Sequence, residues 1–443
     1  MRLRIEIPEN VNDIIQKLRQ SGYQAYAVGG CIRDSLMSLL PDDWDICTSA
    51  LPQQTLEVLQ LPNIIENGMK HGTVTVRYHG ENYEITTFRK DGQYTDHRRP
   101  SSVTFVNEIK EDLSRRDFTI NALAYNEEEG LQDYFEGYQD IQRRILRCVG
   151  NPDERFQEDG LRIMRALRFA ARFELTIEPL TAEAIHRNKA LLKNISAERI
   201  NTEFTKLLLS VGVEKILTEY ADVIAEFIPE IKPMIGFEQK NPHHVYDVWS
   251  HTVKVVSFSP EDKVLRLAAF FHDIGKPYTF TKSEDGTGHF HGHPEVSAEM
   301  SSFIMKRLRY DNHTIAAVRN LVRVHDKRPP LEKKSVRRLL RDIGETMYLP
   351  LTELKRADAK AQNPDKLPEK LEYVDELERM LQEEIHSQSA YALRQLAVNG
   401  GDLKEAGITD GKEIGRMLQE LLELVIEEKV PNERNALLKA IGL

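Results

Sequence analysis

Hydrophobic and polar positions follow two different periods along this chain, and the change between them falls near residue 150. Before it, runs that alternate every second residue, Thr73 to Arg77 and Tyr83 to Thr87, are mixed with amphipathic stretches such as Asn10 to Gln20. Residues two apart share one face of a strand, whereas residues three or four apart share one face of a helix. The pattern therefore predicts strands at 72–78 and 82–88 in a region that mixes strands and helices.

From about residue 150 to the end, the helical period continues without a further strand signal. A chain of 443 residues is longer than a single hydrophobic core usually supports, so several domains are expected. The predicted fold class is α+β, with a small mixed-sheet domain followed by all-helical domains. The boundaries that we expect give the domains 1–145, 146–235, 236–365 and 366–443.

The first candidate site lies where a buried strand meets a helix, at Gly29 and Gly30. Glycines let backbone N–H groups approach a ligand, the helix N-terminus favours an anion, and Arg33 is placed to bind phosphate. Asp43 and Asp45, two apart in a predicted strand, share a face and repel unless a cation lies between them. Each signal alone also fits a plain turn or a solvated sheet edge. Together they predict a metal-assisted phosphoryl or nucleotidyl transfer.

Two further groups could complete this site. Glu84, on a neighbouring predicted strand, is either a third carboxylate beside the aspartates or a solvated strand residue. Arg116 and Asp117, in a loop that leads into a helix, either grip a triphosphate and a ribose hydroxyl or form a surface salt bridge. Between these segments, the polar stretch from Asp91 to Pro100 is predicted to be a loop.

A row of charges marks the start of the helical region. Four residues recur at every third position, and at about 100° per residue the row curves across one broad helix face. Its arginines have no acidic residue four positions later, which is unusual for a solvated face. We therefore expect this helix to bind an anion or a base. The row consists of Asp159, Arg162, Arg165 and Arg168.

A second constellation of potential metal ligands lies between residues 240 and 365. One histidine on an apolar helix is most often a core residue, but five such positions, one of them an adjacent His-Asp pair, are hard to explain in that way. Metal sites in helical bundles are commonly built from inward-facing ligands on several helices. The candidate ligands are His251, His272, Asp273, His293, His325 and Asp358.

Composition narrows the class of protein. No stretch is apolar enough to cross a membrane, the first residues lack a signal-peptide pattern, and the three cysteines show no metal or disulfide spacing. A cytoplasmic protein without a membrane partner is therefore expected. The net charge of −10 argues against nucleic acid as a partner, but binding surfaces are local, and the stretch from Arg162 to Arg172 is basic.

The motifs of this chain resemble those of two known families. Residues 22–205 resemble the class II tRNA nucleotidyltransferases, the CCA-adding enzymes of the polymerase-beta-like superfamily. Residues 245–358 resemble the HD phosphohydrolases in the order His, His-Asp, His, His, Asp. The motifs of the first resemblance are Val28-Gly29-Gly30-Cys31-Ile32-Arg33-Asp34, Asp43-Trp44-Asp45, Gly68-Met69-Lys70-His71-Gly72-Thr73-Val74, Glu84-Ile85-Thr86-Thr87-Phe88-Arg89, Arg115-Arg116-Asp117-Phe118-Thr119-Ile120-Asn121-Ala122 and Glu158-Asp159-Gly160-Leu161-Arg162.

The first resemblance implies a nucleotidyltransferase head at 1–145 and a nucleotide-selecting neck at 146–235. It implies addition of CCA to tRNA from CTP and ATP, with Mg²⁺ held by Asp43 and Asp45. Glu84 would help to take the proton from the tRNA hydroxyl. The loop from Asp91 to Pro100 matches the element that switches the enzyme from CTP to ATP.

The same resemblance implies the nucleotide-binding residues. One acceptor and one fork-shaped donor can read the Watson–Crick edge of a base, and a protein template of this kind would replace a nucleic-acid template. The implied triphosphate and ribose contacts are Gly29, Gly30, Arg33, Arg116 and Asp117, the template is Asp159 with Arg162, and its supports are Arg165 and Arg168.

The second resemblance implies an HD domain at 236–365 and leaves 366–443 as a helical tail. His251, His272, Asp273 and Asp358 would hold one divalent transition metal or Mg²⁺, and His293 with His325 could complete a second site. The implied activity is hydrolysis of a 2′,3′-cyclic or 3′-phosphate at a damaged tRNA end.

Other functions remain open from the sequence. An enzyme that adds only the terminal A, or a poly(A) polymerase, would carry nearly the same head motifs. In a different class, the HD part would be the working hydrolase and the head only an RNA-binding module. The intact Asp43 and Asp45 argue against that last function. The sequence does not predict the oligomeric state.

Overall fold

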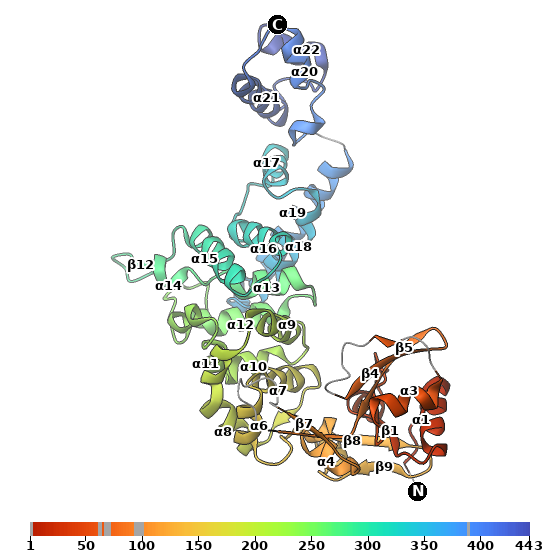
Figure 1. Ribbon diagram of the computed structural model, residues 1–443. Helices are drawn as coiled ribbons and strands as arrows, with labels where there is room; N and C mark the ends of the chain where they lie inside the picture. The colour runs from red at the N-terminus through yellow and green to blue at the C-terminus, as the bar shows by residue number, and fades with distance from the viewer. Residues whose placement is uncertain (1–2, 61–63, 66–71, 93–101, 388–389) are drawn as a thin grey trace. The chain divides into compact units, whose positions relative to one another are not determined.

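The computed structural model describes residues 3–60, 64–65, 72–92, 102–387 and 390–443. The chain divides into two compact units, Met1–Pro229 and Glu230–Leu443. The predicted fold class is confirmed, because a mixed sheet occupies the first part of the chain and helices form nearly all of the rest (Figure 1). The boundaries expected at 145, 235 and 365 stay predictions.

The sheet of the first unit has the strand order β3-β4-β5-β2-β1-β8-β9. Strands β2 and β5 are parallel and the other neighbours are antiparallel, so the sheet is mixed. The two strands expected from the alternating pattern form the hairpin of β4 and β5. Its turn, at His79 and Gly80, has positive φ angles of 48° and 92°, which suits the twist of a two-residue hairpin loop. The seven strands are β1 (Ala25–Val28), β2 (Ile46–Thr48), β3 (Ile64–Ile65), β4 (Thr73–Tyr78), β5 (Glu81–Thr87), β8 (Leu123–Asn126) and β9 (Gly130–Asp133).

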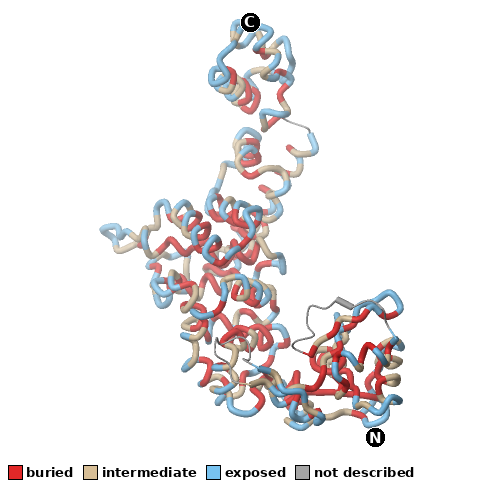
Figure 2. The backbone as a smooth tube through the Cα atoms, viewed as in Figure 1, coloured by how far each residue is buried: buried red, intermediate tan, exposed pale blue. Residues whose placement is uncertain are grey.

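Helices cover this sheet because their apolar residues recur with a helical period. Helix α1 (Glu9–Gln20) packs against β1 and α3 (Pro52–Leu59). Strand β1 is buried on both faces, and its Tyr26 and Val28 pack with α4 (Ile109–Ser114). Figure 2 shows the resulting continuous buried core of the sheet region. The residues of α1 that face the core are Val11, Ile14, Ile15 and Leu18.

The second half of the first unit is helical, as expected from the sequence. Helix α7 is its centre and packs against α6, α9 and α10. The remaining elements of the unit are α2 (Gly30–Leu36), β6 (Arg89–Asp91), β7 (Val103–Phe105), α5 (Gly137–Arg143), β10 (Ile145–Leu146), α6 (Pro152–Glu158), α7 (Leu161–Arg172), β11 (Thr176–Ile177), α8 (Pro179–Asn188), α9 (Ala197–Leu208), α10 (Val213–Glu219) and α11 (Ala221–Ile224).

In its described residues, the second unit is a helical assembly with one short hairpin. In the described part of the chain, none of the helices is long and apolar enough to cross a membrane. The elements are α12 (Val248–Phe258), α13 (Lys263–Phe271), α14 (Lys276–Thr279), β12 (Thr281–Lys282), β13 (Gly288–His289), α15 (His293–Arg307), α16 (Asn312–Val324), α17 (Lys333–Ile343), α18 (Tyr348–Lys360), α19 (Leu367–His386), α20 (Gly400–Glu405), α21 (Gly411–Ile426) and α22 (Arg434–Ala440).

Two predictions fall mostly outside the described residues. Of the loop expected from Asp91 to Pro100, only its first two residues are described. The segment Gly68 to His71 of the head motifs also lies outside them. The three cysteines are free and buried, in agreement with the absence of disulfide spacing in the sequence.

Candidate functional sites

The glycine pair lies where the sequence predicts it, between strand β1 and helix α2. Gly29 has a φ of 82°, a left-handed conformation that favours glycine. A Cβ atom at Gly29 would lie 2.7 Å from a terminal nitrogen of Arg116, so the guanidinium packs directly on the glycine backbone. Arg116 also forms a 3.5 Å ion pair with the buried Asp112. The turn and Arg116 therefore form one positively charged corner.

Strand pairing brings the three predicted carboxylates together. Asp43 and Asp45 lie just before β2, not within a strand as the sequence pattern suggested, because regular pairing begins only at Ile46. Ile46 is aligned with Ile85 in the parallel pair of β2 and β5, so Asp45 lies beside Glu84. Asp43 and Glu84 are exposed, and Asp45 is half-buried.

The electrostatics of Asp45 show how closely these groups interact. Burial, together with the negative charges of Asp43 and Glu84, raises the pKa of Asp45 to about 6, and Arg116 opposes the shift. Oxygen ligands of this kind are those that Mg²⁺ prefers, and a divalent cation would relieve the repulsion. The donor set therefore fits the Mg²⁺ that the sequence implies.

Arg33 is the predicted phosphate ligand whose surroundings fit that prediction least. Its side chain is buried, with nitrogens 2.7 and 2.8 Å from Asp34 and 2.6 Å from the amide oxygen of Asn121. The guanidinium also lies over the rings of Phe169 and Phe173, at 5.1 and 4.7 Å. These contacts join α2 to α7 beneath the glycine turn, so in this structure Arg33 supports the corner from inside.

Asp117 is also held by the protein. Its carboxylate accepts hydrogen bonds from the backbone of Phe118 and the amide of Asn121, and Arg165 lies 2.8 Å away. Burial alone would raise the pKa of Asp117, but the charge of Arg165 and the hydrogen bond from Asn121 outweigh it and lower the pKa to about 2. Asp117 is therefore a charged, fixed acceptor next to the row of arginines.

The arginine row of α7 differs from its prediction in one respect. The sequence lacks acidic residues four positions after each arginine of this helix, but in the structure the arginines pair with acids at earlier positions or on other elements. Arg162 pairs with Glu158, four residues earlier, at 2.5 Å. Arg165 pairs with Asp117, and Arg168 pairs at 2.5 Å with Glu203 of α9. Each charge is therefore balanced by a partner that fixes its direction.

Asp159 lies before α7, not on it. Helix α6 ends at Glu158, and the carboxylate of Asp159 accepts the backbone N–H of Leu161 at 3.0 Å. Arg199 holds the same carboxylate at 2.7 Å. Arg162 donates to the backbone carbonyl of Arg115 at 2.9 Å, next to the predicted triphosphate contacts. The predicted template pair thus stands at a helix start, with both members oriented by neighbours.

In the second unit, the predicted ligands converge from separate elements. His251 lies within α12, His293 begins α15, and Asp358 lies within α18. His272 and Asp273 follow the last turn of α13, which ends at Phe271, and so lie just after the helix on which the sequence placed them. His325 follows α16. Four of these ligands form two groups with Asp273, as described next.

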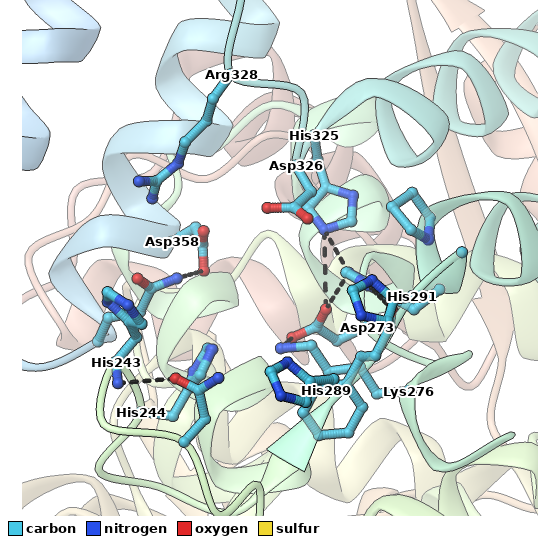
Figure 3. A pocket seen from close by; sticks show the side chains of 16 residues that line it. His243, His244, Asp273, Lys276, His289, His291, His325, Asp326, Arg328 and Asp358 are labelled. Carbon is cyan, nitrogen blue, oxygen red and sulfur yellow. Dashed lines mark hydrogen bonds and ion pairs between the residues drawn. The ribbon is translucent and has the colours of Figure 1, made fainter. Parts of the chain in front are cut away.

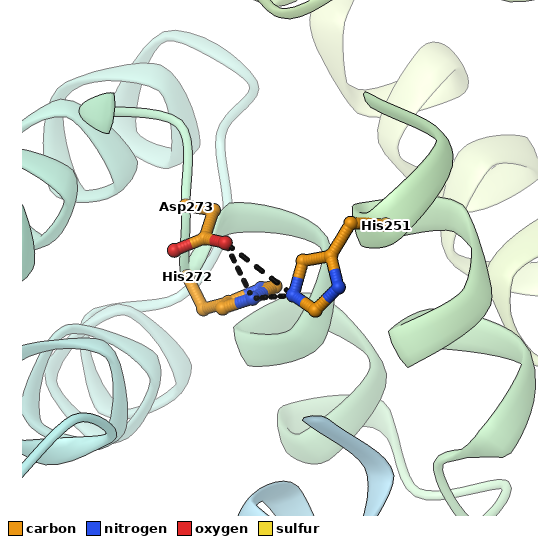
Figure 4. A group of neighbouring side chains, drawn as sticks. All are labelled: His251, His272 and Asp273. Carbon is orange, nitrogen blue, oxygen red and sulfur yellow. Dashed lines mark hydrogen bonds and ion pairs between the residues drawn. The ribbon is translucent and has the colours of Figure 1, made fainter. Parts of the chain in front are cut away.

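Asp273 joins two groups of ligand atoms, one on each carboxylate oxygen. Oδ2 lies 3.5 and 3.1 Å from Nε2 of His251 and His272 (Figure 4). Oδ1 lies 3.3 and 3.8 Å from Nε2 of His293 and His325. Within the described ranges, these are the two groups of at least three ligands whose atoms all lie within 4.8 Å, and the head carboxylates do not form such a group.

The hydrogen bonds of the four histidines indicate what these groups bind. Each Nδ1 contacts a backbone carbonyl, at 2.6 Å for His325 and 3.1 Å for His251. A carbonyl only accepts, so each Nδ1 carries the proton and each Nε2 offers a lone pair. Two Nε2 pairs nevertheless face each other at 3.3 Å, around the carboxylate of Asp273, whose Oδ2 also forms a 2.8 Å ion pair with Lys276. Such lone pairs repel unless a cation lies among them, and the donor set fits a divalent metal.

A cavity of about 350 Å³ opens beside these ligands (Figure 3). Asp273, His293, His325 and Asp358 lie on its wall. Asp358 also contacts His251 at 3.0 Å and the amide of Gln362 at 2.8 Å. The cavity has further polar lining residues that the sequence pattern did not single out, because none repeats a known spacing. They are His243, His244, Lys276, His289, His291, Asp326 and Arg328.

In the first unit, the residue that the sequence analysis missed is Asp112. It is fully buried and holds Arg115 at 2.8 Å in addition to Arg116. Burial alone would raise the pKa of Asp112, but the charges of Arg115 and Arg116 outweigh it and hold the pKa below its usual range. An acidic residue three and four positions before two arginines on a helix predicts such ion pairs, so the sequence pattern could have indicated them.

Three family models match successive parts of the chain. Residues 25–147 match a model described as Poly A polymerase head domain. Residues 174–234 match one described as Probable RNA and SrmB-binding site of polymerase A. Residues 279–441 match one described as tRNA nucleotidyltransferase domain 2.

Curated relatives carry one common name. The CCA-adding enzyme of Streptococcus pneumoniae is 32% identical over 428 residues, which cover 96% of this chain and 94% of that protein. The CCA-adding enzyme of Limosilactobacillus fermentum is 47% identical over 214 residues, 48% of this chain and 53% of that protein. The chain thus spans about half the length of the latter relative and nearly all of the former.

Solved structures extend the similarity to the fold. The crystal structure of the Bacillus stearothermophilus CCA-adding enzyme in complex with CTP is similar with a TM-score of 0.72 and 29% identity, over 98% of this chain and 97% of that one. The Thermotoga maritima CCA-adding enzyme complexed with tRNA has a TM-score of 0.55 at 20% identity, over 97% and 94% of the two chains. At that identity, the second likeness concerns the fold alone.

Proposed function

The chain belongs to the family of CCA-adding enzymes, and from this membership we propose that it adds C, C and A to tRNA 3′ ends from CTP and ATP without a nucleic-acid template. The observation that carries the proposal is the corner where Asp43, Asp45 and Glu84 meet beside the glycine turn and Arg116. Carboxylates next to a positively charged phosphate cradle are what nucleotidyl transfer requires.

In this proposal, the residues of the corner bind and orient the two substrates. Asp43 and Asp45 would hold Mg²⁺, which lowers the charge of the triphosphate and the pKa of the attacking hydroxyl. The tRNA 3′ oxygen forms a bond to the α-phosphorus, and the bond from the α-phosphorus to the bridging oxygen breaks and releases pyrophosphate. Glu84 accepts the hydroxyl proton. The N–H group of Gly30, with Arg116, binds the phosphates, whereas the N–H of Gly29 donates to the carbonyl of Leu123 at 2.9 Å and holds the turn in place.

Nucleotide choice is assigned to the start of α7. Asp159 and Arg162 offer one acceptor and one forked donor to the edge of the incoming base, while Arg165 and Asp117 hold their surroundings in place. Arg168 is buried against Glu203 and over the ring of Phe169 at 4.0 Å, so it supports the helix and does not reach the base.

The experiment that tests the function uses tRNA transcripts that end before CCA, after one C and after both Cs. Each is incubated with Mg²⁺ and with CTP, ATP or both, and product lengths are read on a gel. We expect stepwise growth to CCA followed by a stop. Addition of A alone to the transcript that ends in CC would identify an A-adding enzyme, and an untemplated A ladder a poly(A) polymerase.

The first prediction concerns Asp43→Ala. Removal of one carboxylate leaves the other unable to hold the metal in place, so nucleotide incorporation should fall by at least about 10³-fold, while tRNA affinity changes little. Incorporation and filter binding measure the two effects. Asp42→Ala, an exposed aspartate one residue earlier, is the matched control and should retain activity. Retained incorporation in Asp43→Ala would remove the assignment of the head.

We propose further that the second unit is an HD-type phosphohydrolase that acts on 2′,3′-cyclic or 3′-phosphates at tRNA ends. The observation that supports it is the convergence of four Nε2 atoms around Asp273, with Asp358 next to His251. The bound divalent metal would supply a hydroxide at neutral pH. In the balanced reaction, the oxygen of a water molecule forms a bond to phosphorus, the bond from phosphorus to one ribose oxygen breaks, and that ribose oxygen takes the proton that the water loses. A 2′,3′-cyclic phosphate leaves a phosphomonoester, and a 3′-phosphate leaves inorganic phosphate.

The second prediction separates this activity from nucleotide addition. Asp273→Asn removes the negative charge common to both ligand groups, so metal-dependent hydrolysis of a 2′,3′-cyclic phosphate should fall by at least about 10²-fold. Addition of CCA should not change. Asp375→Asn, at an exposed aspartate of α19 that lines neither the cavity nor the smaller one beside it, is the matched control. Full hydrolysis by Asp273→Asn would contradict the assignment.

A further inference from the structure

The cavity beside the metal ligands continues past Asp358 into a smaller one. This second cavity, of about 120 Å³, shares lining residues with the larger one, among them Asp358, His325 and Arg328. A metal-bound phosphate at Asp273 and Asp358 would therefore occupy only one end of the combined space.

Arg328 lies on the wall of both cavities. Figure 3 shows its side chain extending into the larger cavity on the side of Asp358. Within the described ranges, its guanidinium has neither an ion pair nor a hydrogen bond with another side chain. A forked donor of this kind matches the geometry of a phosphate.

Two further cationic or donor groups lie on the same side. Lys370 lines the smaller cavity and is only 7% exposed, and its Nζ meets the amide oxygen of Gln362, not a carboxylate. Buried lysines are rare unless they are paired with an acid. Lys366 lies 3.4 Å from Nδ1 of His243, which places the ring proton on Nε2 and makes His243 a donor at the cavity rim.

The smaller cavity is lined by charges of both signs, the acids Asp326, Asp358 and Glu369 and the cations Arg328, Lys355 and Lys370. Burial and then the positive charges of Arg328 and Lys366 lower the pKa of Lys370, while Asp358 and Glu369 act in the opposite direction. Asp358 is engaged by His251 and Gln362. Lys355, on the same wall, donates to the carbonyls of His325 and Lys327 at 2.6 and 2.7 Å. Of the three cations that line the smaller cavity, Arg328 and Lys370 are therefore the two that a ligand could meet.

We propose that Arg328, Lys370 and His243 bind a second phosphate, the internucleotide phosphate that precedes the terminal one. The ligand class of this site is then an RNA 3′ end of at least two nucleotides, in preference to a mononucleotide. The inference rests on the proposed hydrolase function only for the turnover that follows binding.

The test compares two non-hydrolysable ligands, the 3′-methylenephosphonates of adenosine and of the dinucleotide CpA, by calorimetry on the metal-loaded full chain. We expect the dinucleotide to bind about 10- to 100-fold more tightly, because the mononucleotide has no second phosphate and lacks the charged hydrogen bonds to it. Arg328→Gln should remove this difference and leave the affinity for the mononucleotide unchanged. Arg323→Gln, the same change at an exposed arginine of α16 that lines neither cavity, should retain it.

Two outcomes would overturn the inference: equal affinity of the wild-type protein for the two ligands, or a loss in Arg328→Gln that is equal for both. Turnover of the corresponding 2′,3′-cyclic phosphates is measured in parallel. If neither is hydrolysed while the dinucleotide preference depends on Arg328, the hydrolase proposal fails and the phosphate subsite stands.

Discussion

At the scale of single residues, the charged side chains of the first unit are fixed by partners distant in sequence. Asp117 is paired with Arg165, Asp159 with Arg199, and Arg168 with Glu203. Buried charges need such partners, since an unpaired one costs several kcal/mol. The sequence shows which residues are charged, but these pairs span 35 residues or more in the chain, so their formation depends on the fold.

The third prediction concerns Asp117→Asn. The folded state holds the pKa of Asp117 at about 2, below its ordinary value of 3.8, so ionisation stabilises the fold above pH 4 and this contribution is lost as the pH falls toward 2. The variant should lose about 2 kcal/mol at pH 7. Its difference from the wild type should shrink below pH 4.

Urea unfolding monitored by tryptophan fluorescence measures this effect. The chain has two tryptophans, and a Trp249→Phe background leaves Trp44 to report on the first unit. Asp153→Asn, which removes an exposed pair with Arg187, is the control with a small expected effect. A difference that is independent of pH would contradict the role of the charge.

At the scale of elements, helix α7 shows what periodicity predicts and what it omits. Its apolar residues are buried against neighbouring helices, as the pattern requires. The position of Asp159 before the helix, and the pairing of Arg162 with Glu158, follow from the break between α6 and α7. A repeat of every third residue continues unchanged through the break between the two helices, so the spacing alone does not reveal where α7 begins.

The fourth prediction concerns Arg162→Lys. Lysine keeps the charge but loses the fork that a base edge requires, so the choice between CTP and ATP should weaken by about 10-fold or more, while tRNA affinity is retained. Misincorporation is measured on transcripts that end in C and in CC. Arg155→Lys is the matched control, because Arg155 binds the same Glu158 and a backbone carbonyl. Equal fidelity in the two variants would contradict the protein template.

At the scale of the whole molecule, the two compact units carry separate chemical groups. The first contains the carboxylates and the glycine turn, and the second contains the histidines around Asp273. Each group is built within its own unit. The proposed addition and hydrolysis are therefore expected to be separable by single substitutions.

The fifth prediction concerns metal removal. A metal that binds only the folded second unit stabilises it by about 2.7 kcal/mol at a concentration 100 times its Kd, so a chelator should lower the unfolding midpoint of that unit. A Trp44→Phe background leaves Trp249 to report on it. In Asp273→Asn the midpoint should not respond to metal, and an unchanged response there would show that the metal binds elsewhere.

The sequence by itself determined the mixed-sheet and helical regions, the hairpin and the candidate ligand sets, because periodicity, turn residues and motif spacing are local properties of the chain. Only the tertiary structure decided that Asp45 lies beside Glu84, through the parallel pairing of β2 and β5. It also decided that Arg33 is buried and that Arg328 faces a cavity. These outcomes depend on contacts between distant segments, which form when the chain buries its apolar surface and each buried charge must find a partner.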